Sequence, residues 1–202
     1  MELWRAADPL VLASGSKIRR TLLEAAGVAL EVAPSDIDER AAEAAAPSSS
    51  PAAVAALLAR AKASAVARLH PGRLVLGADQ ILDLDGRRFT KPADRAAARA
   101  QLRALAGRAH ELHSAIAFVQ DGKVLFEHIS TARLTMRTFS DTFLDRYLDV
   151  AGAAATESVG AYQLEGPGVQ LFESVDGDYF TVLGLPLLAA LDFLRRHGCL
   201  AS

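Results

Sequence analysis

Cysteine is almost absent from this chain of 202 residues, since Cys199 is its one copy. No internal disulfide can form, which is typical of a protein from a reducing compartment. The chain also lacks any apolar run near the roughly 18–20 residues that cross a bilayer. Residues 1–14 carry Glu2 and Asp8 beside a short apolar stretch and make a poor signal peptide. These absences predict a soluble, cytoplasmic protein with no membrane partner.

An excess of charge is also missing, because 22 Lys and Arg face 24 Asp and Glu, and the formal net charge is −2. That balance argues against a broad surface for nucleic acid or an anionic membrane, but it is compatible with a local basic pocket. The hydrophobic share of 51% and the charged share of 23% are those of an ordinary folded protein. At this length we expect one domain over residues 1–202.

Several catalytic motifs are missing as well. The chain has no Walker A loop, no G-x-G-x-x-G and no G-x-S-x-G, and it shows no Ser-His-Asp order. Its five histidines have no zinc-ligand spacing, and His110 and His113 fit an ordinary strand. The sequence therefore offers no serine-hydrolase or zinc-enzyme template.

What is present is an alternation of strand and helix patterns, read from apolar spacing and from the residues that cap helices and form turns. Strands are predicted at 9–13, 28–33, 73–84, 109–119 and 123–137, and helices at 17–26, 51–69, 95–106, 141–150 and 186–197. Residues 41–50 are predicted as a loop, and residues 161–185 as short strands with an Asp-Gly turn at 176–177. This order predicts an α/β fold with a mixed β-sheet flanked by helices.

The helix that begins at Lys17 has an unusual first turn. A helix N-terminus prefers acidic residues, but here Lys17, Arg19 and Arg20 occupy the turn and Ser14 and Ser16 lead into it. Cations and free N–H groups at one point suit a bound phosphate. A solvated basic helix face explains the same residues equally well.

Lys62 lies on the apolar stripe of another predicted helix, because Val54, Leu58 and Lys62 are spaced by four. Most lysines in such positions only extend an ammonium group to solvent. The alternative is a cation directed into a site.

Asp79 interrupts the apolar run of residues 74–82, where an unpaired carboxylate costs several kcal/mol. It is an acceptor for nearby backbone N–H groups, a general base or a metal ligand. Asp36, Asp38 and Glu39 end another strand and are its candidate companions. Gly77 and Ala78 are expected to keep the space around Asp79 open.

Eight blocks of the sequence occur in an order that resembles the Maf family of nucleoside triphosphate pyrophosphatases. They are LASGSKIRRTLLEAAG, DIDER, ARAKA, LGADQILDLDG, TKP, LAGRAHELHSAIAF, GAYQLEGPG and VDGDYFTVLGLPL. The resemblance implies a single α/β domain similar to the inosine triphosphate pyrophosphatase fold, with a substrate cleft. It also implies hydrolysis of a nucleoside triphosphate to the monophosphate and pyrophosphate, with Mg²⁺ (or Mn²⁺ or Co²⁺) as the metal and commonly a homodimer.

The same resemblance assigns roles to individual residues. Asp79 matches the essential aspartate that activates water or binds metal, and Glu39 matches a second acid. The residues expected to hold the phosphates are Ser14, Arg19, Lys62 and Lys91. The usual S-P-R-R reads Ser16-Lys17-Ile18-Arg19 here, so Ser16 and Lys17 join the substrate-binding candidates and which cation contacts which phosphate stays open.

Base preference is read from Gln80 and Glu165, which resemble the branch of the family that acts on 7-methyl-GTP. A carboxylate accepts both adjacent donors of guanine. The alternatives are a dTTP and UTP pyrophosphatase, in which Glu165 is only a solvated turn residue, and a nucleotide-binding regulator of cell division. Tyr162 and Phe172 are candidates either for stacking on the base or for the core.

Overall fold

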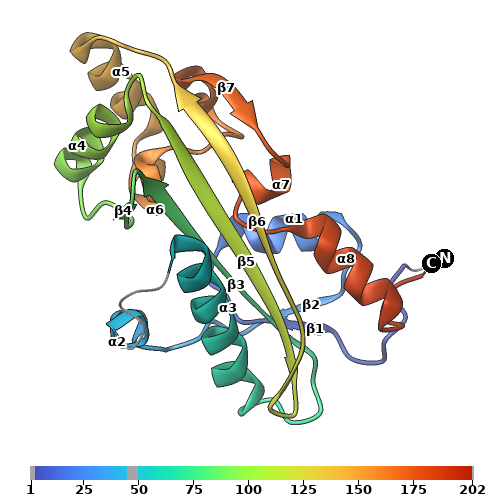
Figure 1. Ribbon diagram of the computed structural model, residues 1–202. Helices are drawn as coiled ribbons and strands as arrows, with labels where there is room; N and C mark the ends of the chain where they lie inside the picture. The colour runs from blue at the N-terminus through green and yellow to red at the C-terminus, as the bar shows by residue number, and fades with distance from the viewer. Residues whose placement is uncertain (1–2, 45–49, 202) are drawn as a thin grey trace. The chain divides into compact units, whose positions relative to one another are not determined.

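The fold is known from a computed structural model that describes residues 3–44 and 50–201 (Figure 1). A seven-stranded sheet has the order β2-β1-β3-β5-β6-β7, and β4 pairs with β3. The strands are β1 (Leu10–Leu12), β2 (Leu30–Val32), β3 (Val75–Leu84), β4 (Arg87–Phe89), β5 (Ala109–Gln120), β6 (Lys123–Met136) and β7 (Phe172–Asp176). Since β1 runs parallel to β2 and β3 while β4 and β7 pair antiparallel, the prediction of a mixed sheet is confirmed.

Helices occupy the segments between the strands, as the alternating pattern predicts. The α-helices are α1 (Lys17–Ala25), α2 (Glu39–Ala44), α3 (Pro51–Ala67), α4 (Arg95–Leu105), α5 (Asp141–Ala151), α6 (Ala154–Glu157), α7 (Tyr179–Val182) and α8 (Leu187–Arg196). Two short 3₁₀ helices are η1 (Val159–Ala161) and η2 (Pro167–Leu171). The helix starts follow from local chemistry, since Ser50, Asp94 and Ser140 each accept a hydrogen bond from the backbone N–H three residues on.

The chain forms two compact units. Unit 1 consists of the described residues within 1–80, 114–130 and 184–202, and unit 2 consists of residues 81–113 and 131–183. The strands β3, β5 and β6 each contribute residues to both units. One domain over residues 1–202 stays a prediction.

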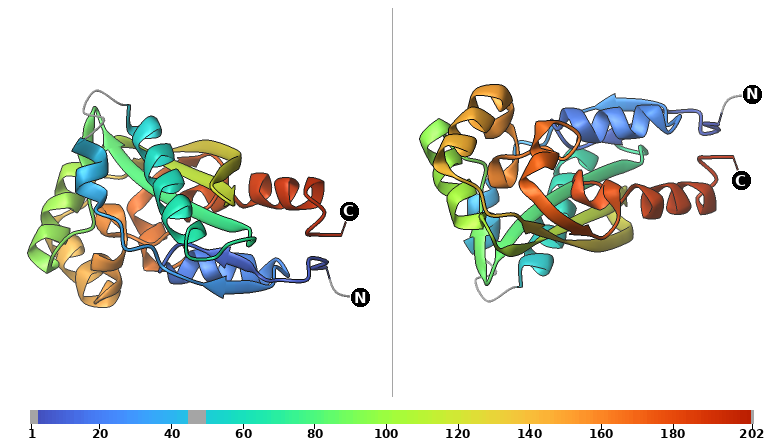
Figure 2. Two further views of the ribbon diagram at one scale, coloured as in Figure 1. Left: turned by 90° about the horizontal axis from the view of Figure 1, so that it is seen from below. Right: turned by 90° about the horizontal axis from the view of Figure 1, so that it is seen from above.

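Unit 1 holds its two chain ends together. Trp4 and Leu200 form an isolated β-bridge, and the amide of Arg5 donates to the carbonyl oxygen of Cys199 at 2.9 Å. Figure 2 shows both ends of the described chain on the same side of unit 1. The aromatic ring of Phe193 on α8 packs against Phe118, with ring centroids 4.4 Å apart, so α8 covers the β5–β6 hairpin.

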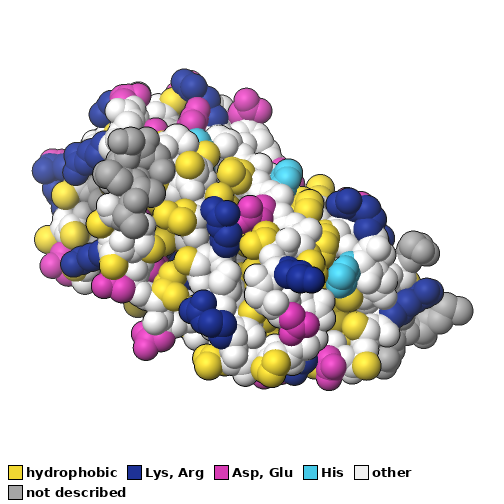
Figure 3. All heavy atoms as spheres, turned by 60° about the horizontal axis from the view of Figure 1, so that its bottom comes forward, with side chains coloured by type: hydrophobic (Ala, Val, Ile, Leu, Met, Phe, Trp, Pro, Cys, Tyr) yellow, Lys and Arg dark blue, Asp and Glu magenta, His cyan; other side chains and the backbone are white. Residues whose placement is uncertain are grey.

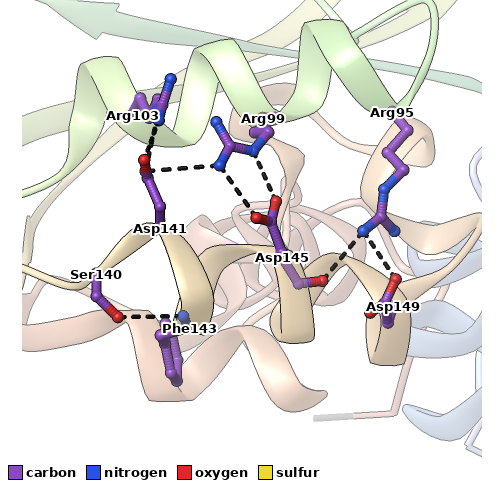
Figure 4. Close-up of polar contacts among 8 residues, drawn as sticks. All are labelled: Arg95, Arg99, Arg103, Ser140, Asp141, Phe143, Asp145 and Asp149. Carbon is purple, nitrogen blue, oxygen red and sulfur yellow. Dashed lines mark hydrogen bonds and ion pairs between the residues drawn. The ribbon is translucent and has the colours of Figure 1, made fainter.

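Unit 2 is built around an apolar core that includes Leu82, Leu102, Leu134 and Tyr147. On its surface, a ladder of charges joins α4 to α5 (Figure 4). Its ion pairs are Arg95 with Asp149, Arg99 with Asp145 and Asp141, and Arg103 with Asp141. Spacing by four places the three arginines on one face of α4, opposite acids that are also spaced by four.

Two predicted segments differ from the structure. Residues 41–44 belong to α2 and are not a loop, while residues 45–49 of that prediction lie outside the described residues. Residues 161–185 contain one strand, β7, in place of several short strands. The Asp-Gly pair at 176–177 leads into α7, because the Asp178 side chain accepts a hydrogen bond from the Thr181 amide at 2.9 Å and caps that helix.

The described residues include no membrane-spanning helix, and the face drawn in Figure 3 has no large area of one charge. Within the described ranges, no helix combines the length and the apolar character that crossing a bilayer requires. In Figure 3, basic and acidic side chains are interspersed among hydrophobic ones.

Candidate active site

The candidate site in unit 1 is centred on Asp79, which lies in the middle of β3 and is 6% exposed. Its Oδ1 accepts a hydrogen bond from Lys62 Nζ at 2.6 Å. Lys62 comes from α3, where it is buried on the same face as Val54 and Leu58. The carboxylate in the apolar run is therefore paired with a charge, while a role of Lys62 in substrate binding stays a prediction.

Gly77 explains how α3 comes close enough to β3 for this ion pair. A Cβ atom at Gly77 would lie 2.1 Å from the carbonyl oxygen of Ala59 and 2.7 Å from the amide nitrogen of Ala63, both on α3. Only glycine permits that approach. The prediction that Gly77 leaves open space beside Asp79 is therefore wrong, because the backbone of α3 fills the space.

Glu39 brings a second carboxylate to the same lysine. Its Oε1 lies 2.8 Å from Lys62 Nζ, and its side chain is 50% exposed where α2 begins. One ammonium group thus contacts a buried carboxylate and a half-exposed one. Asp36 and Asp38, the other acids of this segment, are exposed, and the Asp38 side chain accepts a hydrogen bond from the Ala41 amide at 2.9 Å.

The electrostatic setting of Asp79 combines opposing effects. Burial raises the pKa of Asp79 above the ordinary carboxyl value of 3.8, while the positive charges of Lys62 and Arg19 act to lower it. The net direction is upward. Asp79 therefore holds a proton more readily than an exposed aspartate, and its ionised form depends on the cations beside it.

The β1–α1 loop contributes Ser14 and Arg19. Arg19 Nη1 donates to Ser14 Oγ at 3.0 Å and to the carbonyl oxygen of Ala78 at 2.8 Å, and its Nε donates to the carbonyl oxygen of Gly184 at 2.8 Å. The guanidinium therefore ties together the loop, the residue before Asp79 and the segment that precedes α8. Its partners in this structure are neutral oxygens.

Ser16 and Lys17 are the other substrate-binding candidates at the start of α1. The amide of Ser16 donates to Ser14 Oγ at 3.3 Å, and Lys17 is exposed. The turn contains no acidic residue. The structure thus places Ser14, Ser16, Lys17 and Arg19 on one loop and helix start.

Gln80 follows Asp79 on β3 and is held by a neighbouring strand. Its Nε2 donates to Ser114 Oγ at 3.0 Å, and Ser114 is fully buried on β5. Because successive residues of a strand face opposite sides, the side chains of Gln80 and Asp79 leave β3 in different directions.

Lys91 and Glu165 belong to unit 2. Lys91 is exposed between β4 and α4, and Glu165 is exposed between η1 and η2. Their membership of the same site as Asp79 stays a prediction. Tyr162 is a core residue, since it is 5% exposed and its hydroxyl is hydrogen-bonded to His110 Nε2 at 2.8 Å. Phe172 packs against it with ring centroids 4.8 Å apart.

The carboxylates of Asp79 and Glu39 fit a hard divalent metal ion such as Mg²⁺, which prefers oxygen ligands. Both contact one nitrogen atom, so they reach a common point. No group of three or more His, Cys, Asp or Glu suited to a metal occurs among the described residues. Such a pair suits Mg²⁺ that takes its other ligands from water and substrate phosphates.

Two backbone groups were missed by the sequence interpretation, namely the carbonyls of Ala78 and Gly184 that accept from Arg19. Gly184 has a positive φ of 88°, which disfavours other residues. A glycine within the apolar segment LGLP was the available signal for a special backbone position.

Comparison with known proteins matches residues 9–197 to the family described as Maf-like protein. A "Nucleoside triphosphate pyrophosphatase" of Rhodopseudomonas palustris is 56% identical over 201 residues, which cover 100% of both chains. A protein of the same name from Bradyrhizobium diazoefficiens has the same identity and coverage, and one from Paramagnetospirillum magneticum is 56% identical over 93% of this chain and 98% of its own. This chain belongs to the Maf-like protein family.

Proposed function

We propose that this enzyme hydrolyses a nucleoside triphosphate to the monophosphate and pyrophosphate, with a modified purine nucleotide such as 7-methyl-GTP as its substrate. The reaction class is supported by the family and by relatives named nucleoside triphosphate pyrophosphatase that are 50–56% identical over the whole chain. A role in removing modified nucleotides from the pool follows from that substrate class.

The observation that carries the proposal is the buried carboxylate of Asp79, paired with Lys62 and close to Arg19. Hydrolysis of a phosphoanhydride needs cations that neutralise the phosphate oxygens and a group that directs water at phosphorus. Asp79 orients the attacking water, and its raised pKa makes it a better proton acceptor than an exposed aspartate. Lys62, Arg19 and the exposed Lys17 supply positive charge to the triphosphate.

A divalent metal ion, Mg²⁺ in the first instance, is part of this proposal. Asp79 and Glu39 are the residues that would hold it, since both present carboxylate oxygens to the position now taken by Lys62 Nζ. A bound metal ion polarises phosphoryl oxygens.

The preference for a purine is supported by chemistry at Glu165. Its carboxylate is exposed and accepts the two adjacent donors that guanine presents. Gln80 is the second residue that we assign to base recognition. The names of the relatives specify no base, so the choice of base depends on these residues of the chain itself.

The test is pyrophosphate release from a panel of 7-methyl-GTP, GTP, UTP and dTTP. We expect 7-methyl-GTP to give the highest kcat/KM. In Glu165→Gln, we expect a smaller difference in kcat/KM between the purine and the pyrimidine nucleotides. Preference for dTTP and UTP would replace the purine assignment. Nucleotide binding without pyrophosphate release would instead support a regulatory binding protein.

Asp79→Asn tests the catalytic assignment, and we expect it to abolish most turnover. Asp83→Asn is a matched control, because Asp83 lies on the same strand and its Oδ2 accepts from the Gly86 amide of the adjoining turn at 3.3 Å. Near-normal turnover in Asp79→Asn, or equal loss in both variants, would remove Asp79 from the mechanism.

A cytoplasmic location and a homodimer belong to the same proposal. The single cysteine supports the first, and the family resemblance supports the second. Cell fractionation and light scattering of the purified chain test them.

A further inference from the structure

Lys62 forms two ion pairs at once. Its Nζ lies 2.6 Å from Asp79 Oδ1 and 2.8 Å from Glu39 Oε1, and its side chain is 11% exposed. The ammonium group therefore occupies the point at which the two carboxylates meet. These are the same two carboxylates that suit a divalent metal ion.

The contacts make Lys62 and a metal ion mutually exclusive at this point. A cation that binds both carboxylates meets the positive charge of Lys62 a few ångströms away, and at that range the repulsion is large at any dielectric found in proteins. The described residues supply no third His, Cys, Asp or Glu to complete a metal-binding group that would outweigh it. In the protein without nucleotide, the Lys62 ammonium group outcompetes a metal ion for the two carboxylates, because the lysine is part of the chain and loses no translational freedom when it binds them.

A nucleotide changes this balance. Its phosphates provide oxygen ligands for the metal and, at the same time, an alternative anionic partner for the ammonium group. Lysine is suited to such an exchange, since its ammonium is a compact point charge on a flexible stem. Glu39 is half exposed at the start of the six-residue helix α2, so water reaches it when the lysine leaves.

We propose that Lys62 is a resident counter-ion that keeps divalent metal off Asp79 and Glu39 until a nucleotide is bound. Metal and nucleotide therefore bind together, and Lys62 transfers from the carboxylates to the phosphates as they enter. This inference rests on the proposed function for the identity of the ligand, but it concerns metal affinity in the absence of nucleotide and is measured without turnover.

The experiment is a titration of the purified chain with Mn²⁺ alone. The concentration of free Mn²⁺ is measured at each point by electron paramagnetic resonance, and the dissociation constant is obtained from it. Two variants, Lys62→Met and Lys62→Gln, remove the charge. Lys62→Gln retains an amide that can donate to Asp79, so it serves as the test if Lys62→Met folds poorly. We expect each to bind Mn²⁺ at least about tenfold more tightly than the unaltered chain, since one unit charge is removed from direct contact with the site.

Two controls isolate the effect. Arg60→Met removes a charge from the same helix, where Arg60 pairs with Glu127 at 3.4 Å, and we expect it to leave Mn²⁺ affinity unchanged. Lys62→Gln combined with Asp79→Asn should lose the gain, because it removes a metal ligand.

Unchanged Mn²⁺ affinity in both folded Lys62 variants, or an equal gain in Arg60→Met, would overturn the proposal. That result leaves the proposed function standing if the unaltered chain releases pyrophosphate. A chain that releases none while Lys62→Gln gains Mn²⁺ affinity would refute the function and retain the counter-ion.

Discussion

The ion pair of Lys62 with Asp79 predicts a large coupling in stability. In Lys62→Met the Asp79 carboxylate remains buried and loses the cation 2.6 Å away. Removing one partner of a buried pair typically costs about 3–5 kcal/mol in the free energy of unfolding. Glu39 also loses its partner, but its side chain is 50% exposed and water replaces the contact. The cost therefore arises mainly at Asp79.

Adding Asp79→Asn to Lys62→Met removes the stranded charge. We expect the double variant to recover at least about 2 kcal/mol of the loss, because two neutral side chains need no counter-charge. The assay is urea unfolding of the unaltered chain, both single variants and the double variant, with the coupling taken from the cycle. Single effects that add to within about 0.5 kcal/mol would refute the reasoning, since additivity is the behaviour of residues that do not interact.

Acidification gives an independent check on the same pair. Burial raises the pKa of Asp79, and loss of Lys62 removes a cation that lowers it. A group whose pKa is raised in the folded state stabilises that state at low pH, and this contribution is lost as the pH rises through the folded pKa. The loss in the free energy of unfolding caused by Lys62→Met should therefore become smaller as the pH falls. A penalty that stays constant down to about pH 4 would contradict a stranded carboxylate as its cause.

Three further outcomes are expected. Arg19→Lys retains the charge but loses the planar group that serves three oxygens, so kcat should fall roughly tenfold, and an unchanged kcat together with an unchanged urea midpoint would exclude a positioning role. Burial lowers the pKa of His110 from 6.5 to about 4, so stability should fall by roughly 3 kcal/mol as the pH drops through that interval, and His110→Asn should flatten urea midpoints measured across it. The hydrogen bond from Arg99 lowers the pKa of Asp145 below 3.8, so this pair stabilises the fold above that pH and ceases to do so in acid. Asp145→Asn should therefore lower the melting temperature slightly at neutral pH, less in high salt, and not at all well below pH 3.8.

The elements of the fold could be predicted where local chemistry determines them. Ser50 and Asp94 cap α3 and α4, as their positions before apolar stripes predict. The prediction failed after Tyr162, where an Asp-Gly pair resembled a hairpin turn. A cap at Asp178 starts a helix there instead, and turn propensity alone does not distinguish the two outcomes.

The sequence singled out Lys62 and Asp79 as unusual residues, but it did not predict that they contact each other. Spacing by four identified Lys62, and an interrupted apolar run identified Asp79. Lys62 and Asp79 touch because α3 packs closely on β3. Gly77 allows this close packing because it has no side chain, and no local sequence pattern predicts it. The partners of Arg19 were even harder to predict from the sequence. Two of them are backbone carbonyl groups, and every residue carries one.

Lys62 and the partly buried Arg19 of unit 1 differ in their partners, and under the proposed function this difference orders the approach of a triphosphate. Lys62 is compensated by two carboxylates, whereas the Arg19 hydrogen bonds end on a hydroxyl and two carbonyls that carry no net charge. The charges of Asp79 and Glu39 act on Arg19 as well, but an incoming anion can approach Arg19 without displacing a carboxylate from one of these hydrogen bonds. Phosphate oxygens are attracted there first, without breaking an ion pair. Under the proposed function, Lys62 exchanges partners only when a phosphate is near enough to replace a carboxylate, so we expect the loop to be occupied before Asp79 is released.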